Sequence, residues 1–157
     1  MKILQTLFLD KNDQINGTER VCIDLCNEFI KAGHSVYLMC NSRVKPYIDK
    51  KVNLIDIKFT QNRFNPIFLY KIWLFIKQIR PDIIHSHNTK ILEIMSYAQI
   101  FTRKKIPIVF TKHNWFVKKK MKLANLRVAI SPQTLELCKL SNKNGGGQYH
   151  HSQWYSF

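Results

Sequence analysis

The chain has 157 residues, 45% of them hydrophobic, which is enough for one domain with a substantial core but not for two of ordinary size. This hydrophobic fraction excludes general disorder, and 25 Lys and Arg against 10 Asp and Glu give a formal net charge of +15. A surface this basic favours an anionic partner, such as a phosphorylated ligand, an anionic membrane or a nucleic acid, unless it serves only solubility.

The four cysteines form no Cys-x-x-Cys pair, and no four residues have the spacing of a zinc site, so we predict no metal site and no metal cofactor. Cys22 and Cys26 lie one helical turn apart among apolar residues, which indicates core positions. No signal-peptide pattern follows Met1, and no apolar run approaches the roughly 18 residues of a membrane span. We therefore expect a cytoplasmic protein, which can lie peripherally on the inner face of the plasma membrane.

Apolar strand-like runs alternate with helical patterns along the chain. The predicted elements are strands at 2–9, 35–40, 52–57, 82–84, 106–111 and 126–130 and helices at 18–32, 66–80, 91–100 and 132–140. Gly33 follows the first helix, at a position that favours a left-handed glycine. This alternation predicts an α/β fold, with a Rossmann-like parallel sheet and helices on both faces.

The second predicted helix begins at Asn65-Pro66 and has two different faces. One face is a wide apolar stripe, which should pack on the sheet. On the other face Tyr70, Trp73 and Leu74 lie among basic residues. Aromatic and basic residues on an outward face suit the interface of an anionic membrane, and they suit a contact with a neighbouring domain equally well.

The stretch from Pro81 to Asn88 is central to this pattern. Asp82-Ile83-Ile84 is typical of a short buried strand, and the polar run after it contains His85 and His87. In an open parallel sheet, ligands bind at the carboxyl ends of the strands, where these histidines emerge. Three other polar groups follow predicted strands in the same way: Asn16 to Arg20, His113-Asn114 and Ser131. For Ser131 the alternative is a simple N-cap of the last helix.

The composition changes abruptly at Gly145-Gly146-Gly147. The residues after these glycines show no helical or strand period. We predict one domain over residues 1–141 and a flexible tail over 142–157, in which His150-His151 could bind a metal only loosely.

The Gly-x-Gly-x-x-Gly and P-loop fingerprints are absent, and so is the Gly-x-Ser-x-Gly elbow of hydrolases. Five other segments, in the correct order, resemble the N-terminal domain of glycosyltransferase family 4 enzymes over about residues 1–140. These segments are Asn16-Gly17-Thr18-Glu19-Arg20, Ala32-Gly33-His34-Ser35-Val36, Pro81-Asp82-Ile83-Ile84-His85-Ser86-His87, Thr111-Lys112-His113 and Ala129-Ile130-Ser131. The resemblance implies the N-terminal half of a GT-B fold. It also implies retaining transfer of a sugar from a nucleotide-sugar co-substrate to a glycoconjugate or lipid-linked acceptor.

The resemblance assigns Asn16, Gly17 and Thr18 to the loop that approaches the donor diphosphate and the acceptor. Gly17 has no Cβ to block such an approach, although by itself it would be an ordinary turn glycine. Asn16 stands where the family commonly has a first glycine, and Asn tolerates left-handed geometry.

His113 matches the family histidine that hydrogen-bonds the transferred sugar near the reacting centre, so the resemblance implies a catalytic role for it. His85, His87 and Ser131 match positions that line the cleft and are expected to bind substrate. For the two earlier histidines, a structural hydrogen-bonding role is the alternative. The residues expected to contact membrane or acceptor are Tyr70, Lys71, Trp73, Lys77, Trp115, Lys118, Lys119 and Lys120.

Similar enzymes carry a second Rossmann-like domain with a Glu-x7-Glu motif, and nothing after Glu136 can supply that motif. We therefore expect a truncated enzyme, one part of a split enzyme with a separate C-terminal chain, or a remnant, which is inactive alone. The alternative is a basic, non-catalytic module for nucleic acid or anionic membrane, because Trp115 and Phe116 next to lysines permit base stacking and phosphate contact. No recognition pattern for nucleic acid accompanies the charge.

Overall fold

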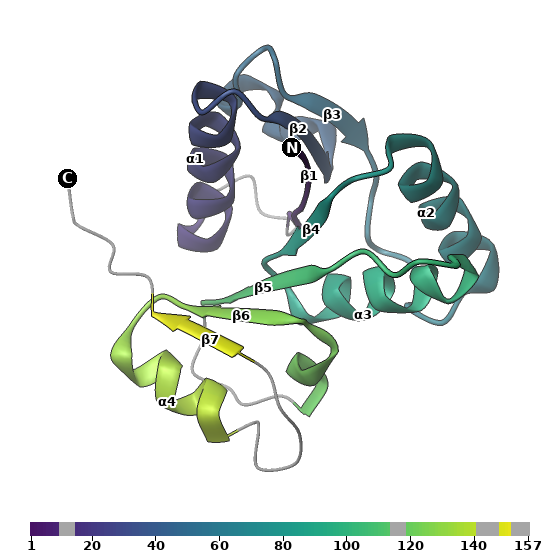
Figure 1. Cartoon of the computed structure of the whole chain (residues 1–157). Helices are drawn as coiled ribbons and strands as arrows, with labels where there is room; N and C mark the ends of the chain where they lie inside the picture. Colours follow the sequence, from purple (N-terminus) through teal and green to yellow (C-terminus); the bar gives the residue numbers. More distant parts are fainter. Residues whose placement is uncertain (10–14, 114–118, 141–147, 152–157) are drawn as a thin grey trace.

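The computed structural model describes residues 1–9, 15–113, 119–140 and 148–151. Its strands are β1 (Lys2–Thr6), β2 (Ser35–Cys40), β3 (Asn53–Asp56), β4 (Ile83–Ser86), β5 (Ile108–Lys112), β6 (Leu126–Ala129) and β7 (Gln148–His151). Its helices are α1 (Gly17–Lys31), α2 (Pro66–Ile79), α3 (Thr89–Ala98) and α4 (Pro132–Leu140), with short 3-10 helices η1 (Ser42–Tyr47), η2 (Gln99–Phe101) and η3 (Lys119–Leu123). The strands form one parallel sheet in the order β3-β2-β1-β4-β5-β6-β7 (Figure 1).

The helices lie on both faces of this sheet, which confirms the predicted Rossmann-like α/β fold. From β1 the chain crosses through α1 to β2 on one side, and α2 later leads it back past β1 to β4. Right-handed crossovers that run in opposite directions along a sheet place their helices on opposite faces. Figure 1 accordingly shows α1 on the other side of the sheet from α2 and α3.

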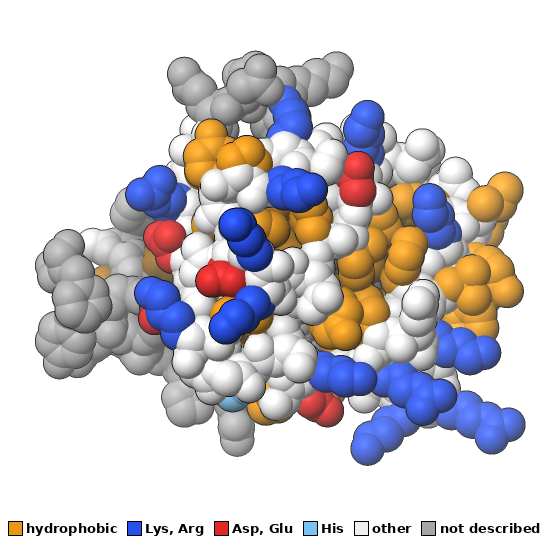
Figure 2. Space-filling view, turned by 90° about the horizontal axis from the view of Figure 1, so that it is seen from above, with side chains coloured by type: hydrophobic (Ala, Val, Ile, Leu, Met, Phe, Trp, Pro, Cys, Tyr) orange, Lys and Arg blue, Asp and Glu red, His pale blue; other side chains and the backbone are white. Residues whose placement is uncertain are grey.

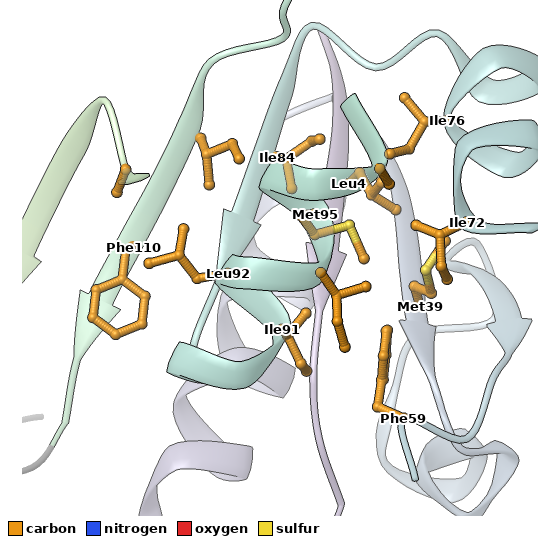
Figure 3. Packing of buried hydrophobic residues seen from close by; sticks show 14 of the residues in the cluster. Leu4, Met39, Phe59, Ile72, Ile76, Ile84, Ile91, Leu92, Met95 and Phe110 are labelled. Carbon is orange, nitrogen blue, oxygen red and sulfur yellow. The ribbon is translucent and has the colours of Figure 1, made fainter. Parts of the chain in front are cut away.

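Two hydrophobic clusters fill the space between the helices and the sheet. On one face, Cys22 and Cys26 of α1 pack with Leu38 of β2. On the other face, the apolar stripes of α2 and α3 pack against residues of the central strands such as Leu4 and Ile84 (Figure 3). The stripe predicted for α2 and the core positions predicted for the two cysteines are thus confirmed.

The helix ends follow from local sequence. The Asn65 side chain accepts hydrogen bonds from the backbone N–H groups of Ile67 and Phe68, at 3.0 and 3.2 Å, and Pro66 occupies the first turn. After α1 the chain turns through Gly33, whose φ of +80° is left-handed, as its position predicts. The end of α2 instead has Arg80 in the left-handed region, with a φ of 51°.

The structure differs from the predicted elements at β1, which ends at Thr6 instead of residue 9, at η3, at β4 and before β3. β4 continues through His85 and Ser86, which the sequence places in a loop, because both side chains find partners on the neighbouring strands. Ser86 Oγ lies 2.9 Å from Thr6 Oγ1, and His85 Nε2 lies 2.7 Å from Thr111 Oγ1. The segment before β3, predicted as a loop, contains η1, which buries Val44.

β7 is a strand where the sequence predicts a flexible tail. It pairs in parallel with β6, from Leu126↔Gln148 to Ala129↔His151. The hydrogen bonds between two strands join backbone groups. This pairing therefore does not require the alternation of apolar and polar side chains from which strands are predicted in the sequence. The rest of 142–157, and the side chains of His150 and His151, lie outside the described residues, and the division at residue 141 stays a prediction.

Candidate active site

Three histidines from two strands come together at the carboxyl edge of the sheet. In the register of the sheet, Gln5 of β1 pairs with His85 of β4, which pairs with Val109 of β5. Because residues two apart on a strand share a face, His87 and His113 follow on that same face. It is the face covered by α1, since Gln5 also pairs with Leu38 of the α1 cluster.

Two of these histidines, His87 and His113, form a short hydrogen-bonded chain with Gln5. His87 Nδ1 lies 3.0 Å from His113 Nε2, and His87 Nε2 lies 3.1 Å from Gln5 Oε1. The rings of His85 and His87 lie next to each other, with centroids 4.3 Å apart and planes tilted by 41°. His85 and His87 are only 8% and 4% exposed, so both make the structural hydrogen bonds that the sequence analysis left as one alternative.

The hydrogen bonds assign a tautomer to each ring of this chain. Gln5 Oε1 can only accept, so the proton of neutral His87 lies on Nε2. His87 Nδ1 then accepts from His113 Nε2–H, and His113 retains its Nδ1 as an acceptor. Such an atom can receive a hydrogen bond from a hydroxyl group of a ligand at the edge of the sheet.

Burial lowers the pKa of all three histidines. It lowers the pKa of His85 to about 4, with a smaller contribution from nearby His113, and it lowers the pKa of His113 to about 4 as well. The pKa of His87 is also well below its ordinary value, first through burial and then through the two neighbouring rings. At neutral pH the three rings are therefore uncharged, and they can position hydroxyl groups but cannot act as cationic acids.

This cluster makes the stability of the fold depend on pH. In the unfolded state these histidines bind protons below about pH 6.5, whereas the buried His85 ring of the folded state binds one only below about pH 4. The free energy of unfolding is therefore highest above pH 6.5 and falls as the pH decreases from 6.5 to 4. We expect His85 alone to make the free energy of unfolding about 2 kcal/mol lower at pH 5 than at pH 7.5, and the other two histidines to add to this loss. Urea unfolding of the native chain and of His85→Gln measures this, and equal slopes against pH in the two would contradict it.

The residues expected to approach the donor lie at the start of α1. Asn16 is exposed, and its backbone is extended, with φ −83° and ψ 178°. It therefore does not adopt the left-handed conformation that asparagine tolerates, and its side chain forms no capping hydrogen bond to α1. Gly17 is also exposed, and a Cβ added to it would meet nothing within 4 Å. The fold itself therefore does not require glycine at this position, while Thr18 next to it is half-buried.

Ser131 caps α4. Its Oγ accepts a hydrogen bond of 3.2 Å from the backbone N–H of Thr134, and its own N–H donates to Thr134 Oγ1 at 3.0 Å. The N-cap alternative is thus observed, and a contact between Ser131 and substrate stays a prediction.

The residues expected to contact membrane or acceptor divide into three groups. Tyr70, Lys71 and Lys77 are exposed along α2, as predicted. Trp73 is instead half-buried against the core and Phe101, and Lys120 forms an ion pair with buried Glu93. Trp115 and Lys118 lie outside the described residues, as does the side chain of Lys119. Contact with membrane or acceptor stays a prediction for all of these residues.

A cavity of about 630 Å³ opens at the carboxyl ends of β1, β2 and β3. Phe8, Asn41, Asp56 and Lys58 are among the residues that line it. It offers apolar and charged walls at the same edge of the sheet as the histidines. Across the described ranges of the chain, no three His, Cys, Asp or Glu side chains converge as a metal site would require.

Three polar residues near this edge received no individual role from the sequence: Gln5, Thr111 and Glu19. Gln5 is completely buried in the middle of an apolar strand, and its Nε2 has no hydrogen-bond partner in the described structure. Thr111 bonds to His85, and Glu19 is buried in the first turn of α1. The signal that could have identified Gln5 is a single amide in an otherwise apolar run, because a buried polar group needs a partner.

Comparison with solved structures shows which proteins share this fold. The chain is similar to the apo form of the lipopolysaccharide outer core galactosyltransferase WaaB, with a TM-score of 0.65 and 16% identity, over 90% of this chain and 42% of that one. It is similar to Anabaena Alr3699/HepE in complex with UDP-glucose, with a TM-score of 0.65 and 14% identity, over 96% and 43% of the two chains. Acinetobacter baumannii MurG matches with a TM-score of 0.62 and 12% identity, over 84% and 42%.

These matches establish the fold, and the chain spans less than half the length of each of the three proteins. A search of curated proteins finds no match. A family model, Glycosyltransferase Family 4, matches residues 15–140. This match covers α1 to α4 and includes every histidine of the cluster, and the chain therefore belongs to glycosyltransferase family 4.

Proposed function

We propose that this chain is the acceptor-side, N-terminal domain of a retaining GT-B glycosyltransferase. The enzyme would move a sugar from a nucleotide-sugar donor to a glycoconjugate or lipid-linked acceptor. The observation that carries this proposal is the hydrogen-bonded pair His87–His113 at the carboxyl edge of the sheet. The structures of HepE with UDP-glucose and with UDP support a nucleotide-sugar donor for this chain as well.

In this proposal each residue of the edge has one role. His113 accepts a hydrogen bond from the transferred sugar through Nδ1, and His87 and Gln5 fix the orientation of its ring. Gly17 lets the donor diphosphate approach the backbone, and the cavity at β1, β2 and β3 receives the acceptor. Donor and acceptor react only when both are held in one geometry, so a second domain must supply the opposite wall of the cleft.

We also propose that the protein works at the cytoplasmic face of a membrane as a peripheral protein. Cys22, Cys26 and Cys40 are buried as thiols that form no disulfide, which suits a reducing compartment. Among the described helices, none has both the length and the apolar composition that crossing a bilayer requires. The exposed side chains of Ile67, Tyr70 and Leu74 on α2 supply apolar surface for the contact.

The gene provides the first test of this function. The nucleotide sequence beyond the codon for Phe157 should encode a second α/β domain with Glu-x7-Glu, in the same frame or a separate one. Absence of such a domain would contradict the enzyme. Preferential binding of DNA or RNA, with a steep dependence on salt, would then favour the basic binding module instead.

Two glycine substitutions separate the role of Gly17 in binding from any role in folding. Gly17→Ala should leave the free energy of unfolding within about 0.5 kcal/mol of native, because a Cβ there has open space and alanine favours helices. The matched variant Gly33→Ala should cost about 1 kcal/mol, because Gly33 has a positive φ. With the second domain supplied, only Gly17→Ala should raise KM for the nucleotide sugar, by roughly tenfold.

Urea unfolding and steady-state kinetics measure these two effects. An unchanged KM for the donor in Gly17→Ala would remove Gly17 from the donor site.

A further inference from the structure

A second cavity, of about 670 Å³, lies far from the histidines. It opens between the last turn of α2 and the loop that leads to β5, and its lining includes Pro81 and Pro107, just before β4 and β5. It is thus at the amino edge of the sheet, whereas the candidate active site is at the carboxyl edge. We call it the basal cavity because it lies at this amino edge. Its lining includes Trp73, Lys77, Arg80, Phe101, Lys104 and Lys105.

The walls of the basal cavity carry uncompensated positive charge. Two elements supply it: α2 and its cap contribute Lys77 and Arg80, and the loop before β5 contributes Arg103, Lys104 and Lys105. In the part of the chain that the structure describes, none of these five side chains forms an ion pair with a carboxylate. Asp82 is the acidic residue of the lining, and its Oδ2 already accepts a 2.7 Å hydrogen bond from the Lys2 backbone N–H. The cavity therefore suits an anion.

Arg80 caps the end of α2 in a backbone conformation that costs a residue with a side chain some strain. Its φ of 51° places it in the left-handed region, where glycine is unstrained and a residue with a Cβ is not. It is also followed by Pro81, which restricts its conformation further. Because Arg80 also lines the basal cavity, an arginine instead of a glycine at this position adds a cation to its wall.

The rim of the basal cavity is apolar and exposed. Trp73 and Phe101 meet there with ring centroids 6.1 Å apart, and Lys77 Nζ lies 5.0 Å from the centre of the Trp73 ring. Ile100 is 72% exposed and Phe101 51% exposed. In Figure 2, hydrophobic side chains gather on the right, where Figure 1 places α2, and Lys and Arg side chains border them.

This apolar rim continues along α2. Ile67, Tyr70 and Leu74 are exposed at the spacing i, i+3 and i+7, so they form one stripe along the outward face of the helix. Contiguous exposed apolar surface of this kind marks an interaction site. A free phosphate or a nucleic acid would satisfy the cations but would leave this surface in water, whereas a lipid satisfies both.

We infer that the basal cavity binds the phosphate-bearing headgroup of an anionic phospholipid, while Leu74, Ile100 and Phe101 enter the boundary of the acyl chains. This inference deepens the peripheral membrane contact proposed above and rests on it. The stripe of α2 then lies along the bilayer.

Vesicle binding of the complete chain tests the inference with two charge-matched variants. The pocket variant is Arg103→Ser/Lys104→Ser/Lys105→Ser, and the control variant is Lys45→Ser/Lys50→Ser/Lys51→Ser, whose residues are exposed around η1 and before β3. Both lose three positive charges. For vesicles of phosphatidylcholine with 30% phosphatidylglycerol, we expect the pocket variant to bind more than tenfold more weakly than the native chain and the control variant to stay within threefold.

Fluorescence of Trp73 supplies a second readout that charge alone would not change. In a Trp115→Phe/Trp154→Phe background, lipids brominated near the glycerol should quench Trp73 in the anionic vesicles, and the pocket substitutions should abolish the quenching. Equal losses in the two charge variants, or no quenching, would overturn the inference while leaving the membrane contact intact. Failure of the native chain to bind anionic vesicles would overturn both, and tighter binding to RNA than to these vesicles would do the same. None of these outcomes bears on the histidine site.

Discussion

Replacement of His113 by alanine is expected to lower kcat for sugar transfer by about 100- to 1,000-fold in the two-domain enzyme. His113 lies at the end of the hydrogen-bonded chain from Gln5, and in the proposed function its neutral ring accepts a hydrogen bond from the sugar at Nδ1. An interaction that strengthens as charge develops at the reacting centre acts on kcat more than on KM. The loss should therefore appear in kcat, with KM for the donor changed only slightly.

The same substitution should leave the fold intact. It removes a hydrogen bond to His87 and costs about 1 kcal/mol of stability, which unfolding in urea measures. His34→Ala is a matched control, because His34 packs against Phe29 at the turn after α1 and lies outside the cluster. Turnover in His113→Ala equal to that of the control would remove His113 from the mechanism.

Replacement of Glu93 by glutamine is expected to have the largest effect on stability, about 3 kcal/mol. The Glu93 side chain is 1% exposed and lies on α3, where Arg63 Nη1 is 2.6 Å from Oε2 and Lys120 Nζ contacts Oε1. The carboxylate thereby joins the segment before α2 and the short helix η3 to α3. Without the negative charge, Arg63 and Lys120 lie beside a neutral amide. The amide does not compensate these two cations for the water that they lose on folding.

Glu28→Gln is the control for this experiment. Glu28 also forms an ion pair, with Lys31 at 2.7 Å, but both side chains are more than 60% exposed. We expect it to change the free energy of unfolding by less than about 0.5 kcal/mol, and less still at 1 M salt. A cost for Glu93→Gln as small as that for Glu28→Gln would show that the buried carboxylate does not tie these elements together.

The sequence predicts the elements of this fold because local signals mark them. Alternating apolar runs identify six strands, and Asn65-Pro66 and Gly33 mark the ends of helices that the structure places there. β7 and η1 were missed, since edge pairing and a short 3-10 helix depend on backbone contacts with distant residues and leave no period in the sequence.

The candidate site was predicted less completely than the fold. His85, His87 and His113 could be placed at strand ends, but their mutual hydrogen bonds depend on the register between strands. The partnership of Gln5 with His87 joins residues 82 apart in the chain, and no local pattern contains that proximity. For the same reason Lys120 resembled an exposed cation in the sequence, although it pairs with Glu93.

β1 is synthesised first but lies in the middle of the sheet, between β2 and β4. One edge of it can pair as soon as β2 emerges from the ribosome, whereas Ser86, the partner of Thr6 on the other edge, follows 80 residues later. Throughout that interval an apolar strand with an unpaired edge is open to partners from other chains. Folding should therefore be slow for a chain of this size, and an arrest of translation before β4 should produce aggregates instead of a stable subdomain.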